Sequence, residues 1–272
     1  MQNLKIIKNL IKKLSSIFLI LLAGVLVTAF AGCSKTSSKN TCTLKNGILQ
    51  IGTEYGYPPF EYLAEDGTTL IGFDVDLWNE LCRRLELKPV FYDTQWAGIL
   101  DGLETHRYDC IISAITITPE RKERFLITEP YVQNSECFVV NTNSAKSPVT
   151  DPALLNGKKI AYQAETVSDV YVNNLIANGA RFKTFEYDKL LDAFDDLKFG
   201  RVDVVVAESV AAGVIVKNNK DIFRIDFVGE PDAYFGIIVA KDNPELFEKI
   251  QTTLNEMRAD GFMAALEEKW LK

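Results

Sequence analysis

The sequence predicts an α/β fold made of two doubly wound βαβ lobes that are joined by a hinge with two chain crossings. From Gly47 onward, short apolar runs alternate with segments of helical period, which is typical of strands joined by crossover helices in a mostly parallel sheet. This order of elements occurs twice along the chain. The chain passes between the two halves near Gln133 and again near Glu230, so two crossings would form the hinge.

The first half is expected to begin with a strand at residues 48–51 and to continue with a helix over about 74–87. Four apolar residues recur in that helix at the spacing that buries one face: Leu77, Trp78, Leu81 and Leu85. The remaining elements are a strand at 90–92, a helix marked by Ile99, Leu100 and Leu103, and a strand at 110–112.

The second half repeats this order after Gly157. Its expected elements are a strand at 159–162, a helix at 168–177, a strand at 182–185, a helix marked by Leu190, Leu191, Phe194 and Leu197, and a strand at 204–206. Leu103, Arg107 and Asp109 recur as Leu197, Arg201 and Asp203, each 94 residues later. A strand at 235–240 and helices at 246–257 and 262–271 complete the chain.

The first 32 residues have the layout of a secretory signal peptide, because four lysines precede an apolar run from Ile17 to Ala31. Ala31 and Gly32 stand directly before Cys33, which resembles a bacterial lipobox whose thiol is lipidated and becomes the mature N-terminus. Phe30 departs from the leucine that is usual three residues before that cysteine. The alternative is an uncleaved membrane helix, although the run is shorter than the roughly 18 residues that a span needs. Both interpretations place the rest of the chain outside the cytoplasm.

Composition and charge limit the classes of function. The chain is 47% apolar and 25% charged, as in ordinary globular proteins. Without residues 1–32 it would carry 26 basic and 37 acidic residues, a formal charge of −11, which is unsuited to nucleic acid. The expected organisation is a signal peptide at 1–32, a lipidated linker at 33–43, lobe 1 at 44–133 plus 231–272, and lobe 2 at 134–230.

The cysteines and the single histidine indicate neither a metal site nor nucleophilic catalysis. Cys33 is the expected anchor and Cys42 lies in the linker, while three others are expected to be small buried apolar residues: Cys82, Cys110 and Cys137. Their spacing fits no metal site, and the odd count argues against a disulfide framework. His106 lies in a polar stretch and is expected to be a solvated loop residue. We therefore expect no catalytic residue, metal or cofactor.

A ligand of two such lobes would bind in a cleft lined by the carboxyl ends of the strands. This places residues 53–57, 113–121 and 163–168 at the expected cleft, together with Glu208. The segment 113–121 leaves a strand and enters a helix, with Thr118 as N-cap and Pro119 at the first helical position.

Arg121 falls in the first turn of that helix, where the helix dipole disfavours a cation and favours an anion. The arginine is consistent with this place if it and the free backbone N–H groups share a bound anion. An α-carboxylate fits, because a guanidinium can hold it by two charge-assisted hydrogen bonds. The hydroxyls of Ser113 and Thr116 could donate to the same group. Alternatively, Arg121 belongs to a solvated mixed-charge face over 120–124.

Glu208 stands at the end of the equivalent strand in the second half, where it could pair with the ammonium group of an amino acid. A zwitterion would then bridge both lobes. Thr166 and Ser168 open a helix in the second half and could offer further donors to the carboxylate. The alternative for Glu208 is a surface acid ahead of the next helix.

Tyr57 and Trp96 stand at strand exits in the first half, where they could cover the side chain of a ligand, although either could be ordinary core. The candidate ligand-binding residues are Glu54, Tyr57, Trp96, Ser113, Ala114, Thr116, Arg121, Thr166, Val167, Ser168 and Glu208.

These residues lie among ordered motifs that resemble the solute-binding proteins of polar amino-acid ABC importers over essentially the whole mature chain. The motifs are Ile51-Gly52-Thr53, Tyr57-Pro58-Pro59-Phe60, Gly72-Phe73-Asp74-Val75-Asp76, Thr116-Ile117-Thr118-Pro119-Glu120-Arg121, Thr128-Glu129-Pro130-Tyr131, Gly200-Arg201-Val202-Asp203, and Asp260-Gly261 with Lys269-Trp270.

The resemblance implies a type II periplasmic binding protein fold that closes on one free L-amino acid and delivers it to a permease powered by a cytoplasmic ATPase. It implies that Arg121 holds the carboxylate, that Glu208 holds the ammonium group and that Tyr57 covers the side chain. Two positions depart from the family, which usually has aspartate in place of Glu208 and glycine in place of Glu165. The membrane would be contacted only through the lipid anchor.

Three further points stay open. Periplasmic dehydratases of prephenate or arogenate (cyclohexadienyl dehydratases) resemble the same fold, and Glu165 could serve there as a general acid. A second alternative is a receptor or adhesion module that binds another protein, or a ligand-sensing subunit without a transport role. The amino acid itself is not determined, because Glu54 and Glu208 could favour a cationic side chain, whereas Glu54 with Trp96 also resembles cystine binders.

Overall fold

The computed structural model describes residues 42–145 and 147–272 of the 272-residue chain. The predicted signal peptide, the anchor Cys33 and most of the linker at 33–43 lie outside the described residues. No helix among the described residues is both long and apolar enough to cross a membrane. The predictions for residues 1–41 therefore stay predictions.

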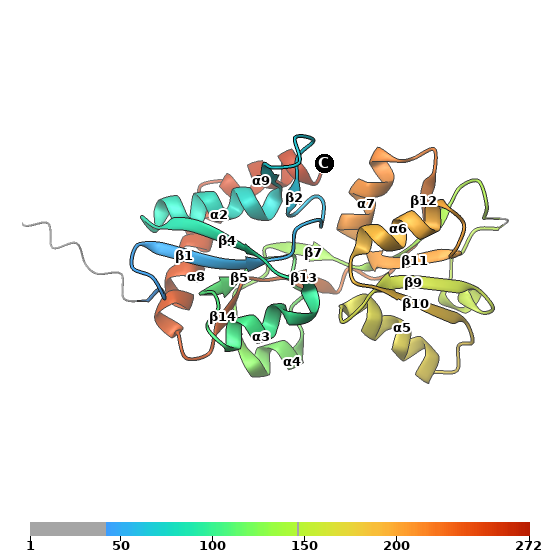
Figure 1. The fold of residues 1–272 in the computed structure, drawn as a ribbon, viewed down its shortest axis with the longest axis horizontal. Coiled ribbons are helices and arrows are strands. Elements are labelled where there is room, and N and C mark those ends of the chain that lie inside the picture. The colour runs from blue at the N-terminus through green and yellow to red at the C-terminus, as the bar shows by residue number, and fades with distance from the viewer. Residues whose placement is uncertain (1–41, 146) are drawn as a thin grey trace, which may run out of the picture. The chain divides into compact units, whose positions relative to one another are not determined.

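The first sheet has five strands in the order β4-β1-β5-β14-β6 (Figure 1). Its strands are β1 (Ile48–Thr53), β4 (Lys88–Asp93), β5 (Cys110–Ile111), β6 (Phe125–Ile127) and β14 (Ile238–Ala240). The helices of this region are α2 (Phe73–Arg84), η1 (Trp96–Gly98), α3 (Ile99–Glu104), α4 (Pro119–Arg124), α8 (Pro244–Ala259) and α9 (Phe262–Trp270). A short hairpin of β2 (Tyr62–Leu63) and β3 (Leu70–Ile71) precedes α2.

The second sheet has the strand order β10-β9-β11-β8-β12. Its strands are β8 (Glu136–Asn141), β9 (Lys159–Gln163), β10 (Lys183–Tyr187), β11 (Val204–Glu208) and β12 (Phe223–Val228). The helices are η2 (Pro152–Leu155), α5 (Val167–Ala177), α6 (Leu190–Lys198) and α7 (Ser209–Asn218). Both α5 and α6 pack on β9 and β11 (Figure 1).

The sheets are mixed, which differs from the mostly parallel sheets that the sequence predicts. Three strands of each sheet are parallel: β4, β1 and β5 in the first, and β10, β9 and β11 in the second. Then β14 enters the first sheet antiparallel to β5 and β6, and β8 enters the second antiparallel to β11 and β12. Both added strands come directly after a crossing, so they enter their sheets from the opposite direction.

The two crossings pair with each other, since β7 (Val132–Asn134) lies antiparallel to β13 (Ala233–Phe235). The single strand predicted at 235–240 is wrong: β13 and β14 are separate strands in different sheets. The chain changes sheet at Gly236, where a Cβ atom would stand only 2.7 Å from a methyl group of Ile127. The lobe boundaries are not tested by this pairing and stay a prediction.

The internal repeat has a structural counterpart in two aspartates. Asp109 accepts the backbone N–H of Gln50 at 2.7 Å and returns its own N–H to the carbonyl of Gln50. Asp203 makes the same two bonds with Lys159, the equivalent residue at the start of β9. The offset of 94 residues therefore reflects one local design that joins the third strand of each half to the first.

Buried apolar residues fill the space between the helices and the sheets. Leu77, Trp78 and Leu81 on α2 are at most 1% exposed, as the helical spacing predicts. Cys82, Cys110 and Cys137 are free thiols in the core, which confirms their prediction as buried apolar residues, and Cys42 is buried as well. His106 follows α3 with its side chain half exposed, in agreement with a solvated loop position.

Candidate functional site

The carboxyl ends of strands from both sheets surround a small cavity. The residues that line it are Glu54, Tyr57, Trp96, Ser113, Ala114, Gln163, Thr166 and Glu208. Glu54 directly follows β1, while Gln163 and Glu208 are the last residues of β9 and β11. Gln163 lies in a segment expected at the cleft but is not among the candidates named from the sequence.

Glu208 is only 7% exposed, and both of its carboxylate oxygens accept hydrogen bonds from residues that follow strands of the first sheet. Tyr57 donates its hydroxyl at 2.7 Å and Thr116 donates at 2.6 Å. Burial raises the pKa of Glu208, and the hydroxyl donors and the charge of Arg121 oppose that rise. Glu208 is therefore a buried carboxylate, and the alternative of a surface acid is excluded.

Glu54 supplies a second buried carboxylate to the cavity and is 4% exposed. It accepts a hydrogen bond from the amide Nε2 of Gln163 at 2.8 Å and from the backbone N–H of Trp96 at 3.3 Å. Burial raises the pKa of Glu54, while these two donors and the nearby charge of Lys189 lower it. The two glutamates give the cavity a strongly acidic lining.

Arg121 lies where the sequence predicts, in the first turn of α4. Thr118 caps that helix by accepting the N–H of Arg121 at 3.2 Å, and Pro119 is the first helical residue, so both parts of the predicted cap are confirmed. The guanidinium donates to the carbonyl of Thr116 at 2.8 Å and stands 5.5 Å from the ring centroid of Trp96. Arg121 is only 9% exposed, which excludes a solvated helix face. Burial lowers its pKa.

Arg121 does not line the first cavity but a neighbouring one. Trp96 lines both cavities, and the charges of Arg121 and Glu208 act on each other. Glu165 also lines the second cavity, and its carbonyl accepts the indole N–H of Trp96 at 3.0 Å. Its φ of +59° is the left-handed conformation that favours glycine, which agrees with the glycine usual at this position in the resembled family.

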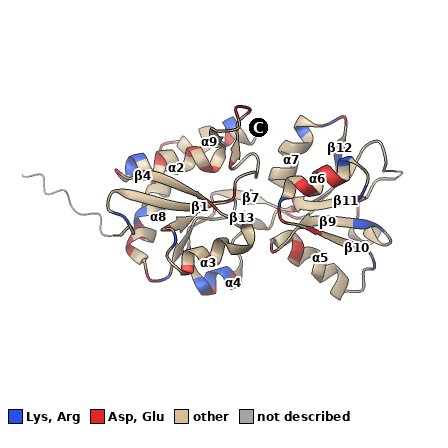
Figure 2. Cartoon of the chain, in the orientation of Figure 1, with Lys and Arg blue, Asp and Glu red and all other residues tan. Residues whose placement is uncertain are grey.

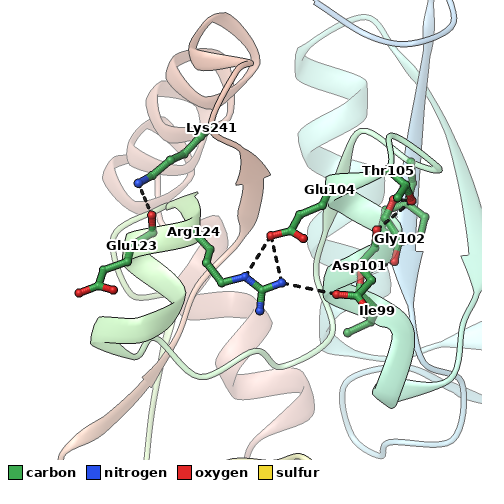
Figure 3. Close-up of polar contacts among 9 residues, drawn as sticks. Ile99, Asp101, Gly102, Glu104, Thr105, Glu123, Arg124 and Lys241 are labelled. Atoms are coloured by element: carbon green, nitrogen blue, oxygen red, sulfur yellow. Dashed lines mark hydrogen bonds and ion pairs between the residues drawn. The ribbon is translucent and has the colours of Figure 1, made fainter.

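A second arginine of α4 fixes the helix to its neighbour. Arg124 donates to Glu104 at 3.0 Å and to Asp101 at 3.5 Å, both on α3, as Figure 3 shows. Lys241 also bonds the carbonyl of Glu123 at the end of α4 (Figure 3). The basic residues of α4 are visible as a blue segment in Figure 2, and within it Arg121 is buried whereas Arg124 faces solvent.

Several of the hydroxyl and backbone N–H groups that are expected to donate to the ligand carboxylate already donate to protein groups. Ser113 donates its hydroxyl to Glu61 at 2.6 Å, and Thr116 donates to Glu208. Ala114 has a positive φ of +46° and gives its N–H to Asp74. The expectation that Ser113 and Thr116 donate to a ligand stays a prediction, and it requires these hydroxyls to change partner.

Thr166 is the N-cap of α5, as its place before that helix indicates. Its hydroxyl donates to the carbonyl of Gln163 at 2.7 Å and accepts the N–H of Asp169 at 3.4 Å. The next two N–H groups, of Val167 and Ser168, are in the first turn and are candidate donors for an anion. Ser168 uses its hydroxyl to donate to Glu136 at 2.7 Å.

Glu136 is an acid next to Glu208 that sequence reasoning missed. It stands opposite Glu208 in the antiparallel pair of β8 and β11. Burial, followed by the charge of Glu208, raises the pKa of Glu136 to about 8. An acid inside the apolar run 136–140 was the available signal, but its position beside Glu208 depends on a strand pairing that the sequence does not reveal.

The arrangement suits a small zwitterion. Two buried carboxylates can hold cationic groups, while Arg121 and the first turn of α5 can hold an anion. Tyr57 and Trp96 provide aromatic surface between these ends. Within the described residues, no group of histidine, cysteine or acidic side chains is arranged to bind a metal ion.

Comparison with known proteins agrees with this geometry. The chain is 30% identical to "ABC transporter arginine-binding protein 1" of Escherichia coli K12, over 82% of this chain and 90% of that protein. It is 29% identical to "L-cystine-binding protein TcyJ" of the same organism, over 92% and 91%. The structure of "an ancestral arginine-binding protein bound to arginine" superposes with a TM-score of 0.78 and 34% identity, covering 83% of this chain and 99% of that one.

This superposition confirms the predicted fold class of two α/β lobes, the type II periplasmic binding protein fold. The sequence profile that matches the chain extends over residues 49–272, which includes both sheets and every candidate ligand-binding residue. The chain therefore belongs to the bacterial extracellular solute-binding proteins, family 3.

Proposed function

We propose that this protein binds a free L-amino acid with a cationic side chain, such as L-arginine, and delivers it to an ABC importer. The observation that carries the proposal is the pair of buried carboxylates, Glu54 and Glu208, in one aromatic-lined cavity. One carboxylate suffices for the α-ammonium group of any amino acid. The second, Glu54, has only the nearby charge of Lys189 and no ion pair with a described lysine or arginine, so a second cation on the ligand would compensate it far better.

The division of roles follows from the positions of the groups. Glu208 is the candidate partner of the α-ammonium group, and Arg121 is the candidate partner of the α-carboxylate. Glu54, with Gln163 beside it, would receive the cationic side chain, and Trp96 lines both cavities. The similarity to proteins named for binding arginine supports this assignment, and the similarity to a protein named for binding cystine makes cystine the main competitor.

The first test is a thermal-shift panel on protein that lacks residues 1–33 and has been refolded to remove carried-over ligand. The panel contains the twenty amino acids, ornithine and cystine. At a ligand concentration of 100 dissociation constants, binding should add about 2.7 kcal/mol to the free energy of unfolding. A rise in melting temperature with arginine, lysine or ornithine is expected. A response to cystine alone would overturn the cationic assignment, and no response at all would overturn amino-acid binding.

The anchor of the ligand carboxylate is tested by two substitutions on the same helix. Arg121→Ala should abolish the arginine-induced rise in melting temperature, because the carboxylate loses its bidentate partner. Lys122→Ala is the matched control. It removes an exposed positive charge that does not line the second cavity, so it should leave the ligand-induced rise intact. Equal losses in both variants would contradict the assignment.

We also propose that the protein is exported and is held on the outer face of the cell membrane by a lipid on Cys33. The support is the sequence pattern of the first 33 residues together with membership of an extracellular family. Expression in a bacterial host should give a membrane-associated product whose N-terminal peptide has the mass of a lipidated cysteine. Cys33→Ser should release the protein from the membrane fraction. Unmodified Cys33 in the mature protein would exclude the anchor.

Binding accounts for the site better than catalysis does. Glu165, the acid considered as a general acid, is exposed and lines the second cavity rather than the one that holds Glu54 and Glu208. The relatives named above are binding proteins. Purified protein is expected to leave prephenate and arogenate unchanged, and turnover of either would establish the dehydratase alternative. Recovery of the permease and ATPase in a pull-down would separate transport from a stand-alone sensor.

A further inference from the structure

Two acidic residues lie next to each other beneath the cavity. Glu61 and Asp74 are each 1% exposed, and they lie close enough for each carboxyl group to shift the pKa of the other. Neither takes part in an ion pair with a described lysine or arginine. Two buried carboxylates without a cation between them would repel each other strongly. At least one of the two groups therefore has to be protonated to remove this repulsion.

The hydrogen bonds of the pair leave one oxygen on each residue without a protein donor. Glu61 accepts the hydroxyl of Ser113 on Oε1 at 2.6 Å, while its Oε2 is buried and has no partner. Asp74 accepts the N–H of Ala114 at 2.8 Å and the hydroxyl of Tyr131 at 3.0 Å, both on Oδ2, while its Oδ1 is buried and has no partner. Both unpartnered atoms are acceptors, and a single proton can satisfy two of them.

We propose that Glu61 and Asp74 share one proton, and that this acid pair holds Ser113 and Ala114 in the conformation that lines the ligand cavity. Asp74 lies in the first turn of α2, where the helix dipole stabilises an anion, and it accepts two hydrogen bonds from protein groups. The proton therefore resides on Glu61, which donates it to Asp74.

The surroundings of the pair favour the retained proton. Burial is the main cause that raises the pKa of Glu61, and the charges of Asp74 and Glu54 add to it. Burial also raises the pKa of Asp74, against the hydrogen bonds from Ala114, Tyr131 and Glu61. The titratable groups that face the pair are Glu54 after β1, Tyr57 before the β2–β3 hairpin and Tyr131 before β7, and none of them carries a positive charge.

The pair reaches the cavity through two short links. The hydroxyl of Ser113 donates to Glu61 and accepts the backbone N–H of Glu54 at 3.0 Å, so it ties the pair to the end of β1. The N–H of Ala114 bonds Asp74 while Ala114 holds a left-handed φ of +46°, which costs free energy for a residue with a Cβ atom. Glu61 and Asp74 are thus positioning residues that act through Ser113 and Ala114. The inference concerns the ligand-free protein and does not depend on which ligand binds.

The shared proton is tested by the pH dependence of unfolding in wild type and Glu61→Gln. In the unfolded chain Glu61 loses its proton near the ordinary value of 4.5, whereas in the folded chain it keeps the proton to higher pH. Over that window the folded state binds one more proton, so the folding equilibrium constant falls about tenfold for each pH unit of rise. Glutamine has an N–H that mimics the proton and does not titrate. The ratio of the variant's folding constant to that of wild type should therefore rise about tenfold per pH unit.

The measurement is chemical denaturation between about pH 6 and pH 8, with Glu65→Gln as matched control. Glu65 is an exposed glutamate four residues away, so its variant reports any general effect of removing an acid from this region. Other buried acids contribute equally to all three proteins and cancel in the ratio. If Glu61→Gln and wild type show the same slope against pH, Glu61 carries no proton and the proposal is overturned.

The positioning role is tested by amide hydrogen exchange of Glu54 and Ala114, whose N–H groups bond Ser113 and Asp74. Glu61→Gln keeps an acceptor for Ser113 and a donor for Asp74, so both amides should exchange within about threefold of wild type. Glu61→Leu keeps neither and should accelerate both by about tenfold or more. Amides of β9 and β10 in the second sheet serve as an internal reference. Unchanged protection of both amides in Glu61→Leu would show that the pair does not position this segment.

Discussion

At the scale of single residues, the position of the Glu208 carboxylate is fixed by two hydrogen bonds, which leave it oriented to bind a cation. Its two oxygens receive Tyr57 and Thr116, which both follow strands of the first sheet, while Glu208 itself ends a strand of the second. These hydrogen bonds favour the ionised form against the burial that raises its pKa. Aspartate, which is usual at this position in the resembled family, has a side chain that is one methylene shorter.

We predict that Glu208→Gln lowers the affinity for L-arginine by about 10- to 100-fold, because a charge-assisted hydrogen bond is replaced by a neutral one. Glu208→Asp keeps the charge and should lose less. Wild-type affinity should fall as pH falls through the raised pKa of Glu208, since the protonated acid no longer attracts an ammonium group. Calorimetric titrations between about pH 5 and pH 8 check this. If the glutamine variant binds L-arginine with the same affinity as wild type, Glu208 does not bind the ammonium group.

The residues that sequence reasoning found have roles that depend on their neighbours in the sequence. The residues that it missed have roles that depend on contacts with distant segments. Arg121 is recognisable from its own helix turn, because an arginine after Thr118 and Pro119 conflicts with the helix dipole. Glu136 acquires its role only through the strand that brings it beside Glu208, and Glu61 only through Asp74 and Ser113. Local chemistry can be read along the chain, whereas contacts between distant segments require the fold.

At the scale of secondary structure elements, the repeat explains why most strands and helices could be predicted. Asp109 and Asp203 make the same pair of bonds to the first strand of their sheet, and the residues before them form the same turn. The equivalent positions His106 and Gly200 both have a positive φ, of +54° and +68°. In the first half the left-handed residue after the helix is His106 and not a glycine. The sequence therefore lacks there the glycine that indicates the end of a helix, which Gly200 provides in the second half.

The elements that were not predicted are those whose existence depends on distant partners. The hairpin of β2 and β3 has only two residues in each strand, so it shows no periodicity. The strand β8 sits between β11 and β12, and a continuous apolar run alone does not reveal an antiparallel neighbour. The split of the predicted strand 235–240 depends on close contact of Gly236 with Ile127.

We predict that the helix cap of α4 matters to ligand binding as well as to stability. Thr118→Ala should lower the free energy of unfolding by about 1 kcal/mol and should also weaken arginine binding, because the cap holds the turn that carries Arg121. Asn243→Ala is the matched control, since Asn243 caps α8 by accepting an N–H three residues later at the same distance of 3.2 Å. The control should lose stability without losing affinity. Calorimetry and chemical denaturation of both variants test this, and parallel effects on affinity would refute it.

At the scale of the whole described chain, the hydrogen bonds between the two sheet regions converge on the cavity. Glu208 receives Tyr57 and Thr116, Gln163 reaches Glu54, and Trp96 reaches the carbonyl of Glu165. The same carboxylates are the proposed ligand partners, so an amino acid competes with protein donors for them. Each carboxylate can therefore bind either the ligand or a protein donor from the other lobe. A bound amino acid has to form hydrogen bonds that replace the ones it breaks between the lobes.

The size of the cavity then requires the lobes to move. The cavity has room for about one water molecule, so no amino acid can enter without separation of the lobes. In the described chain, β7 and β13 are the two segments that connect the sheets, and they pair with each other. Hinge motion about these segments is the expected route. Entry of the ligand requires the ligand-free protein to populate an open state in solution besides the bridged one described, and a bound amino acid should favour closed lobes. We therefore predict that saturating L-arginine lowers the average radius of gyration in X-ray scattering and that Arg121→Ala shows no such change. Superimposable wild-type profiles with and without arginine would mean that the lobes are already held together before binding, and exchange of the ligand would then have to proceed through brief local openings around Trp96.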